Sequence, residues 1–409
     1  MRVLSGNNLP RAKVSNQAAI KDIVYHFGPI YRGEIANLLS LTLPTITTTT
    51  NVLLSKGLLK QLPFSETEKK NVGRRANPID IAEDSRLFLG LEIRGSGRYA
   101  CVTDFRGNVL FSEKDSSFYS DYDECIHAAT DLVKGMLVRN NMSFDKLSRI
   151  GVCLPGVVNE EEGILITHPG YNWSQKPIIA DLRRQMNCSI PIHLENNTCA
   201  RAIAMRYFHQ DELKNAENFA YLFVSLGIAC PITSNIAGVQ NQFFGPGEVG
   251  HMVVDPNGPV CSCGNHGCLE VFSSEKAIIQ KCAAAISKNR APKLAEICRD
   301  RTNPTMDEIL LAQEQQDPAV CSILNEAIFY LGVAVSNIYN FASPHRMVIE
   351  CTLFTKENNR QHLLEIVQKN IYSLTISDVH FTFVEKTDFS GAMGAVAVAI
   401  QNEIFSFTE

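Results

Sequence analysis

Apolar side chains recur at helical spacing three times within the first sixty residues, which predicts helices at 16–27, 32–39 and 44–55. Gly28-Pro29 ends the first helix, and Pro44 suits the first turn of the third. Short apolar runs then predict strands at 58–62 and 79–81, joined by a polar stretch. Three helices followed by a two-stranded wing are typical of a winged helix-turn-helix domain, here residues 1–82.

The third helix of this pattern carries the candidate DNA contacts. Threonine hydroxyls can bind phosphate oxygens or base edges, and their methyl groups can contact thymine. The candidates are Pro44, Thr45, Thr47, Thr48 and Thr49, and the run continues through Thr50. Threonine is a poor helix former, so a β-strand is the alternative for this run.

The wing adds two arginines. Arg74 and Arg75 follow Gly73, and such a pair can enter the narrow minor groove of A·T-rich DNA. A solvated basic loop is the alternative. Residues 1–80 hold eleven Lys and Arg against five Asp and Glu, a net charge of +6, so the remainder of the chain carries −11. A basic head on an acidic body indicates that the head meets a polyanion.

From residue 87 the pattern changes to strands alternating with helices. Three strands at 87–93, 99–103 and 108–111 precede a helix at 123–138, and a second series begins with the strand 220–226. Between them lie strands 150–154 and 190–194 and a helix that begins at Asn196. This order predicts two similar α/β lobes with a cleft between them.

Composition limits the class of protein. At 409 residues the chain can form two or three domains, and 45% hydrophobic and 20% charged residues are ordinary for a soluble globular protein. No run of about 18 apolar residues predicts a membrane span, and the first residues lack the apolar region of a signal peptide. Ten of the thirteen cysteines are scattered singly in apolar surroundings, which indicates reduced thiols in a cytoplasmic protein.

The other three cysteines form a candidate metal site with one histidine. The ligands are His251, Cys261, Cys263 and Cys268, a set that matches the tetrahedral preference of zinc. Glu248 and Glu270 flank the four ligands, and we expect the metal loop to fix both acids in space for binding a polar small molecule. A purely structural zinc knuckle with two incidental surface acids is the alternative.

The chain resembles the ROK family of repressors, open reading frames and sugar kinases, within the actin-like sugar kinase superfamily. The matching segments are Leu154-Pro155-Gly156, Glu195-Asn196-Asn197, Gly247-Glu248-Val249-Gly250-His251, the cysteine run ending Cys268-Leu269-Glu270, Leu331-Gly332-Val333-Ala334 and Gly391-Ala392-Met393-Gly394-Ala395. The resemblance implies a two-lobed actin-like α/β body, of the sugar kinase and ribonuclease H type, behind the winged helix-turn-helix domain. We expect residues 83–195 with 384–409 to form the first lobe and residues 196–383 the second.

The resemblance also implies a sugar site. Glu248, His251 and Glu270 would bind sugar hydroxyls, Asn196 would join them, and Asn197 could still hold a sugar. His251 would bind zinc through one ring nitrogen and keep the other for the ligand. Asn172, beside Trp173, is a weaker candidate, for which loop packing is the alternative.

Four positions depart from the kinases of the family. Asn197 stands where those kinases carry the aspartate that accepts the proton of the sugar hydroxyl, and an amide cannot replace that base. In the first phosphate loop, Arg94 replaces a glycine, and in the second, Pro231 has no N–H to offer. Glu350-Cys351 replaces the paired glycines expected near adenosine. Together these changes predict that the protein transfers no phosphate.

The sequence therefore predicts a transcriptional repressor of carbohydrate metabolism that is not an enzyme. A sugar or amino sugar would bind a cleft ordered by one structural zinc ion per chain. A homodimer or homotetramer would bind a palindromic, A·T-rich operator. Three alternatives stay open: a sugar kinase with an appended DNA-binding domain, a repressor that answers to a protein partner, and one that senses a sugar phosphate through Arg94.

Overall fold

A computed structural model describes residues 9–63, 77–95, 97–168, 170–240, 243, 247–299, 301–372 and 378–408. The chain forms two compact units. Unit 1 contains Met1–Glu212, Ile236–Asn241 and Asp388–Glu409, and unit 2 contains Leu213–Asn235 and Gln242–Thr387. The chain thus leaves unit 1 after residue 212, contributes residues 236–241 to it, and returns to it at residue 388.

The N-terminal head of unit 1 has the predicted order of elements. Helices α1 (Leu9–Phe27), α2 (Arg32–Leu39) and α3 (Leu43–Ser55) precede the antiparallel pair β1 (Leu59–Gln61) and β2 (Ile79–Ile81). Ile20, Ile35 and Ile46 are fully buried, as their helical spacing predicted. The threonine run is helical, so the strand alternative for it is wrong. Arg74 and Arg75 lie outside the described residues.

A five-stranded sheet forms the centre of unit 1. Its order is β10-β6-β3-β4-β5, in which β3 (Leu87–Arg94), β6 (Leu147–Leu154) and β10 (Ile192–Asn196) are parallel. β4 (Gly97–Thr103) is antiparallel to both of its neighbours, β3 and β5 (Val109–Asp115). A smaller antiparallel sheet joins β7 (Val157–Asn159), β8 (Ile164–Thr167) and β9 (Ser174–Lys176). The strands predicted at 87–93, 99–103, 108–111, 150–154 and 190–194 all appear in the larger sheet.

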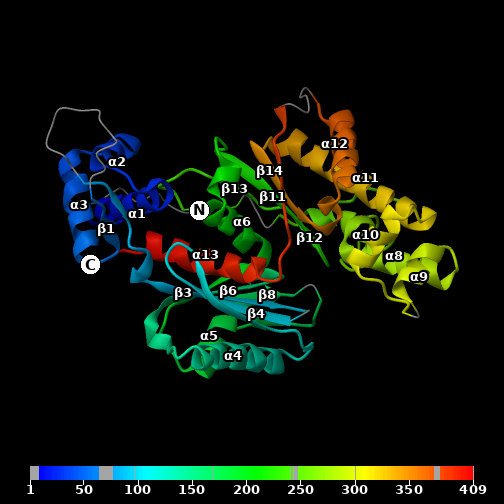
Figure 1. Ribbon diagram of the computed structural model, residues 1–409, viewed down its shortest axis with the longest axis horizontal. Helices are drawn as coiled ribbons and strands as arrows, with labels where there is room; N and C mark the ends of the chain where they lie inside the picture. Colours follow the sequence, from blue (N-terminus) through cyan, green and yellow to red (C-terminus); the bar gives the residue numbers. More distant parts are fainter. Residues whose placement is uncertain are drawn as a thin grey trace. The chain divides into compact units, whose positions relative to one another are not determined.

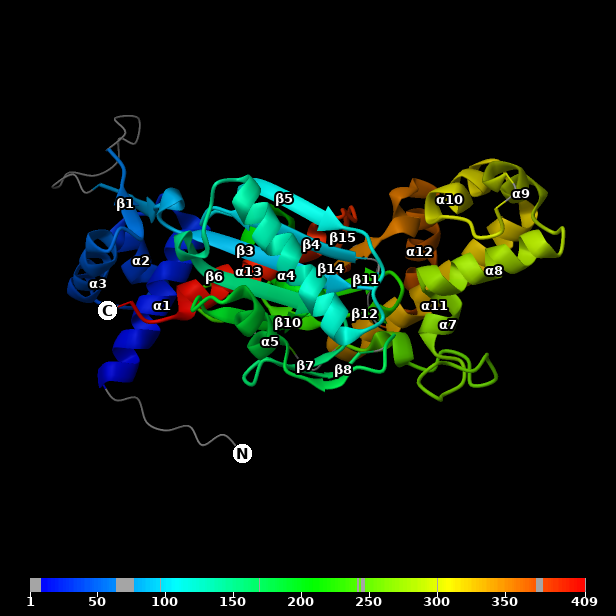
Figure 2. The same ribbon diagram turned by 90° about the horizontal axis from the view of Figure 1, so that it is seen from below.

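Helices cover both faces of the larger sheet (Figures 1 and 2). α4 (Tyr122–Arg139) and α5 (Ile178–Met186) lie on one face, and α6 (Asn197–Phe208) and α13 (Ser390–Phe405) lie on the other. α13 approaches the sheet very closely. A Cβ atom at Gly90 would lie 2.1 Å from the carbonyl oxygen of Ala392, and one at Gly151 would lie 1.8 Å from that of Ala395. Only glycine fits at these two positions.

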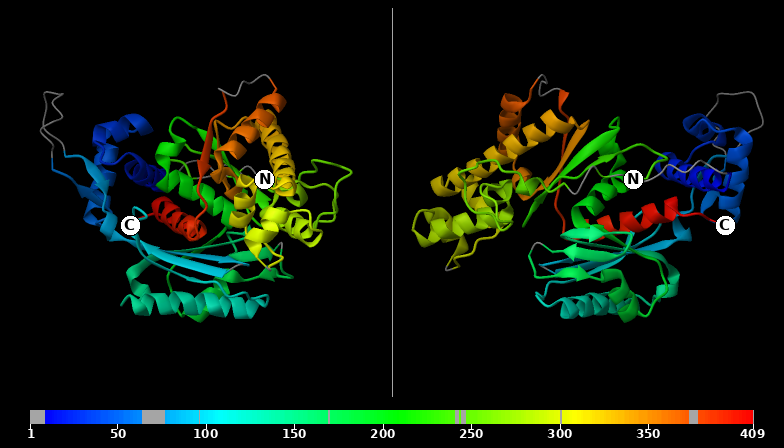
Figure 3. Two further views of the ribbon diagram at one scale, coloured as in Figure 1. Left: turned by 45° about the vertical axis from the view of Figure 1, so that its right-hand side comes forward. Right: turned by 180° about the vertical axis from the view of Figure 1, so that it is seen from behind.

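The far end of α13 reaches the head, next to α1 (Figure 3). Lys21 Nζ donates to the carbonyl oxygens of Glu403, at 2.9 Å, and Ser406, at 2.6 Å. Gln17 exchanges two hydrogen bonds with the main chain of Thr408. The head is therefore attached to the rest of unit 1 by buried polar contacts and not only by the chain between β2 and β3.

Unit 2 is built on a second mixed sheet. β11 (Asn218–Val224), β14 (Arg346–Cys351) and β15 (Phe381–Val384) are parallel, and the short strands β12 (Ile228–Ala229) and β13 (Ile232–Ser234) pair antiparallel with β11. The helices of this unit are α7 (Leu269–Ser273), α8 (Glu275–Ser287), α9 (Pro292–Cys298), α10 (Met306–Glu314), α11 (Pro318–Ala342) and α12 (Glu357–Asn370). Short 3₁₀ helices occur at Glu83–Ser85, Phe144–Lys146, Gln210–Leu213, Val249–His251 and Thr352–Thr355.

Judged by length and composition alone, α11 is the one helix among the described residues that could cross a membrane. Half of its most apolar stretch is buried within unit 2, where Leu331, Val335 and Ile338 belong to the core. Such burial is typical of the central helix of a globular lobe. None of the thirteen cysteines, all of which lie in the described part of the chain, forms a disulfide, and eight of the ten outside the metal-ligand cluster are buried.

One buried carboxylate holds the N-termini of two helices in unit 2. Asp317 is fully buried, and its side chain accepts hydrogen bonds from Ala319 N and Val320 N at the start of α11. It also accepts from Lys293 N, at 3.0 Å, and Leu294 N, at 3.2 Å, in the first turn of α9. Four main-chain donors therefore depend on a single side chain.

We predict that Asp317→Ala lowers the free energy of unfolding by about 2–4 kcal/mol, because it removes a helix cap and leaves buried donors unpaired. Urea unfolding followed by circular dichroism measures this change. Glu326→Ala is the matched control, since the pair between Glu326 and Lys281 lies at the surface and such pairs contribute less than about 1 kcal/mol. Equal stability of the two variants would contradict the assigned role.

Candidate functional site

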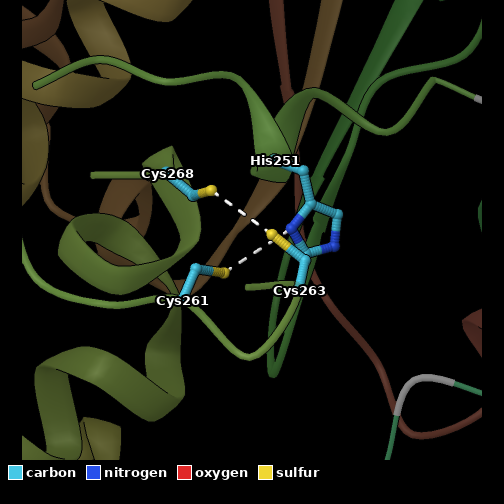
Figure 4. A group of neighbouring side chains, drawn as sticks. All are labelled: His251, Cys261, Cys263 and Cys268. Atoms are coloured by element: carbon cyan, nitrogen blue, oxygen red, sulfur yellow. Dashed lines mark hydrogen bonds between the residues drawn. The ribbon is translucent and has the colours of Figure 1, made fainter. Parts of the chain in front are cut away.

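Four side chains of unit 2 direct one nitrogen and three sulfur atoms toward a common point (Figure 4). His251 ends the 3₁₀ helix Val249–His251, Cys261 and Cys263 lie in the following loop, and Cys268 immediately precedes α7. The four ligand atoms all lie within 4.8 Å of one another. His251 Nδ1 is 3.7 Å from Cys261 Sγ, and Cys263 Sγ is 3.6 Å from Cys268 Sγ.

These separations suit a tetrahedral metal ion. With metal–sulfur bonds of about 2.3 Å, two sulfur ligands at the tetrahedral angle lie about 3.8 Å apart. The main-chain N–H of Asn265 is the largest of the effects that lower the pKa of Cys263 to about 7, which favours the thiolate that binds metals. The cluster can therefore hold a metal ion, and all four of its members were predicted from the sequence.

The same segment positions three groups that could bind a polar ligand. Glu248 directly precedes the 3₁₀ helix, and Glu270 lies in the first turn of α7. His251 turns Nδ1 toward Cys261, which places Nε2 on the other edge of the ring. Partial removal from water raises the pKa of Glu248, the Glu270 carboxylate raises it further, and His251 opposes the rise. The two acids are thus close enough to influence each other electrostatically.

Main-chain hydrogen bonds fix this segment against the sheet of unit 2. Cys230 N, between β12 and β13, donates to the carbonyl oxygen of Gly247, and Leu269 N donates to that of Met252 at 2.9 Å. A Cβ atom at Gly227, in the turn between β11 and β12, would lie 3.1 Å from Glu270 Oε2. The positions of Glu248 and Glu270 are therefore set by the strand ends as well as by the cluster.

In unit 1 the structure gives the two asparagines different surroundings. Asn196 is the N-cap of α6: its Oδ1 accepts from Thr198 N and Cys199 N, and its Nδ2 donates to the carbonyl oxygen of Gly156. Asn197, in the first turn of α6, is buried, and Arg201 donates to its main-chain oxygen. The capping role of Asn196 explains an asparagine at this position by local structure alone.

Glu92, at the position of the first phosphate loop of the family's kinases, contacts two arginines. Glu92 is fully buried at the end of β3, where it accepts from Arg201 Nη2 at 2.8 Å and lies 3.5 Å from Arg94 Nε. Arg94 also donates to the carbonyl oxygen of Asp388 at 2.6 Å, and its guanidinium lies 3.9 Å from the ring centre of Tyr99. Arg94 is therefore engaged within unit 1, which disfavours its use as the receptor for a sugar phosphate.

A second ion pair lies at the carboxyl ends of the strands in unit 2, the edge at which α/β sheets usually bind ligands. Glu275, almost fully buried, accepts from Lys386 Nζ at 2.8 Å, from Ser225 Oγ at 3.2 Å and from Thr352 Oγ1 at 2.5 Å. Ser225 follows β11, Thr352 follows β14, and Lys386 follows β15. Nearby, Glu350 accepts a hydrogen bond from the hydroxyl of Tyr221. Charged side chains of the protein itself occupy this edge.

The candidate DNA contacts of the head lie on α3. Pro44, Thr47 and Thr48 are exposed, whereas Thr45 and Thr49 are half-buried. Thr50 is fully buried and receives a hydrogen bond from Arg32 Nε at 2.9 Å, so it lies on the inner face of the helix, away from the exposed threonines. The unbroken threonine run therefore divides between an outer and an inner face, as in any amphipathic helix.

Two residues on this surface were not found from the sequence. Asn51 is exposed on α3, one helical turn after Thr47 and Thr48, and its Oδ1 accepts from Arg32 Nη2 at 3.3 Å. Arg32 begins α2 and ties it to α3 through Thr50 and Asn51. Continuing the spacing from Thr47 to position 51 would have identified Asn51, whereas no local signal links Arg32 to α3.

The aromatic segment near Asn172 is mainly structural. Trp173 is buried, donates from its indole nitrogen to the carbonyl oxygen of Ser120, and stacks on Tyr171 with ring centres 4.7 Å apart. Asn172 is exposed. The loop-packing alternative therefore holds for Trp173.

Comparison with known proteins identifies the relatives of this chain. The ROK family model matches residues 88–402, which is well over half of the sequence. The xylose repressor of Bacillus subtilis (strain 168) is 24% identical over 337 residues, which cover 82% of this chain and 82% of that protein. These matches extend over most of the relative's length and over both units.

Two solved structures show the same fold. A ROK family transcriptional regulator, a homologue of the Escherichia coli MLC protein, has a TM-score of 0.79 at 21% identity, with 96% of this chain and 97% of that chain covered. A ROK family glucokinase from Streptomyces griseus, solved with glucose and AMPPNP, has a TM-score of 0.64 at 18% identity and covers 76% of this chain and 99% of its own. The body thus has the two-lobed, actin-like α/β fold expected from the sequence. With the family model matching more than half of its residues, the chain belongs to the ROK family.

Proposed function

We propose that the protein is a DNA-binding transcriptional repressor of carbohydrate metabolism, controlled by a sugar or amino sugar and without kinase activity. The observation that carries the proposal is a three-helix head with a β-pair, attached to a ROK body whose candidate sugar ligands Glu248, His251 and Glu270 are all present. The xylose repressor that matches most of the chain supports the same function.

The head binds DNA through α3 and the wing. Exposed Pro44, Thr47 and Thr48, with half-buried Thr45 and Thr49, face the major groove, and Arg74 and Arg75 enter the minor groove of a palindromic, A·T-rich operator. Each copy of the chain carries one head, so a homodimer or homotetramer is needed to read both half-sites. A repressor of this kind acts in the cytoplasm.

The sugar is bound by carboxylates and amides that the fold holds in place. Glu248, Glu270 and the Nε2 edge of His251 are the proposed ligands in unit 2, and Asn196 and Asn197 those in unit 1. One structural zinc ion per chain, held by His251, Cys261, Cys263 and Cys268, orders the first group. Thiolate and imidazole ligands at tetrahedral separations favour zinc over the harder cations.

The absence of kinase activity has a physical basis in both units. Asn197 cannot act as a base, and Glu92 is neutralised by Arg94 and Arg201 and so is not free to hold a magnesium ion. In unit 2 the pair between Glu275 and Lys386 occupies the strand ends. A kinase with an appended head would need all of these positions free for a nucleotide.

Removing one zinc ligand tests the metal assignment. We predict that the purified protein holds about one zinc ion per chain, and that Cys261→Ser loses the metal and melts at a lower temperature, because structural zinc contributes folding free energy. Elemental analysis and thermal melting measure both effects. Cys321→Ser, which changes a half-buried cysteine of unit 2 outside the cluster, should leave both values unchanged.

A titration of operator DNA tests the regulatory function. An operator can be enriched from random-sequence DNA by binding to the purified protein. We predict that one of D-xylose, D-glucose or N-acetyl-D-glucosamine raises the melting temperature and weakens operator binding at least about tenfold. Glu270→Gln should abolish both responses while the sugar-free affinity for the operator stays the same.

A variant of α3 tests whether DNA binding and sugar binding can be altered separately. Thr47→Ala with Thr48→Ala should weaken operator binding about tenfold or more but keep the sugar-induced rise in melting temperature. If operator affinity is independent of every sugar tested, the proposed regulation is wrong.

An ATP-coupled assay tests the absence of phosphoryl transfer. We predict no activity with any of the three sugars, and none for Asn197→Asp, because the base alone does not free Glu92 or the strand ends of unit 2. A ROK glucokinase assayed in parallel is the positive control. Sugar-dependent ATP consumption by the wild-type protein would favour the kinase alternative.

A further inference from the structure

A short segment of the chain that belongs to unit 1 interrupts the sequence of unit 2. Residues 236–240, which we call the strap, lie in the segment Ile236–Asn241 that groups with unit 1, whereas Leu213–Asn235 and Gln242–Thr387 belong to unit 2. Strand β13 ends two residues before the strap, and the motif Gly247–His251 begins seven residues after it. The strap, which belongs to the same unit as the head, therefore lies only a few residues before Glu248 and His251 in the sequence.

The strap is bound to the head and to α6 by its main chain. Gly238 N donates to Asp22 Oδ2, on α1, at 2.7 Å. Arg206, on α6, donates from Nη1 to the carbonyl oxygen of Val239 at 2.6 Å and from Nη2 to that of Ile236 at 3.0 Å. Gly238 also lies against Ala19 and Leu39, which belong to α1 and α2.

Asp22 is the centre of these contacts, and its side chain is fully buried. Besides Gly238 N, it accepts from Arg206 Nη2 at 2.6 Å and from the hydroxyl of Tyr207 at 3.2 Å, and His26 Nε2 lies 3.3 Å away. Head, α6 and strap therefore share one buried carboxylate. We call Asp22, Arg206 and Gly238 the lock.

A network of this kind is stable only when it is complete. Arg206 is 1% exposed, so withdrawal of the strap would remove two carbonyl acceptors from a buried guanidinium and one donor from a buried carboxylate. Unpaired buried charges are costly, so a partly opened network would be unstable. The structure shows the closed arrangement of the lock, and a switch requires a second, open one.

We propose that the strap couples the sugar ligands of the Gly247–His251 motif to the DNA-binding head, with the lock closed in the operator-binding state and opened when a sugar is bound. The inference rests on the proposed function, and it adds the route by which the signal reaches the head. Sugar that repositions Glu248 and His251 acts on the strap, which ends seven residues before Gly247 in the chain, and the strap releases Asp22. The head then loses one of the buried contacts that hold it on unit 1, and two heads no longer match both half-sites.

Breaking the lock by mutation tests the coupling without a sugar. Asp22→Asn keeps the shape of the side chain but removes the charge that Arg206 requires. In the full-length protein we expect operator affinity to fall about tenfold and amide hydrogen exchange to accelerate in α2, in α3 and in residues 247–251. Lys114→Ala, which breaks an exposed ion pair of unit 1 with Asp388, is the control. Unchanged exchange in residues 247–251 would overturn the coupling.

A disulfide that holds the lock closed tests the direction of the switch. A Cβ atom at Gly238 would lie 3.5 Å from Ala19 Cβ, a separation that a disulfide can span. In the oxidised variant Ala19→Cys with Gly238→Cys, operator affinity should change by no more than about twofold when D-xylose, D-glucose or N-acetyl-D-glucosamine is added. Reduction of the disulfide should restore the sugar response of the wild-type protein. Ala19→Cys alone and Gly238→Cys alone are the controls, the second because Gly238 has a φ of +82° that strains any side chain. Zinc content shows that the cluster stays intact.

The two experiments distinguish the inference from the proposed function. If no sugar changes the operator affinity of the wild-type protein, the proposed regulation fails, and the exchange measurements on Asp22→Asn still decide whether the lock couples the head to the motif. If the wild-type protein responds and the oxidised disulfide variant responds equally, the proposed function stands and the strap is not the route. If Asp22→Asn does not fold, the disulfide variant alone decides.

Discussion

The close approach of α13 to the sheet of unit 1 is the constraint on which much of the structure depends. Because Gly90 and Gly151 have no side chains, the helix lies against β3 and β6 with its main chain almost touching theirs. This position lets α13 also pack on α6 and brings its last turn to α1, where Lys21 finds its carbonyl partners. The orientation of the head on unit 1 is thereby set by the packing of a helix that begins more than three hundred residues later in the chain.

Each unit holds an internal ion pair at its strand ends. Glu92 lies between Arg94 and Arg201 in unit 1, and Glu275 is paired with Lys386 in unit 2. A kinase must leave such groups open to water so that magnesium and phosphates can replace the water. Here the charges are satisfied within the protein, which fits the proposed absence of kinase activity.

Local patterns were sufficient to predict the head, the larger sheet of unit 1 and the metal-ligand cluster. The helices of the head, the strands of that sheet, the first strand of unit 2 and the set His251, Cys261, Cys263 and Cys268 follow from spacings of a few residues, whereas the other strands and the helices of unit 2 were not predicted. Burial of Thr50 could not be seen in an unbroken threonine run, since the identity of the residues does not show which face is inside. The pairs Arg201–Glu92 and Arg206–Asp22 join residues 109 and 184 positions apart, and no spacing rule connects such distant positions.

The position of α13 has a consequence for biosynthesis. A ribosome makes this helix after every other described element, so the part of the sheet of unit 1 that α13 covers stays open until the helix arrives, although α6 already lies on the same face. The three helices of the head can form early from local contacts, but the hydrogen bonds from Lys21 must wait for the carbonyl groups of residues 403 and 406. A nascent chain therefore carries a head that can fold early but is not fully attached to unit 1 until α13 has been made.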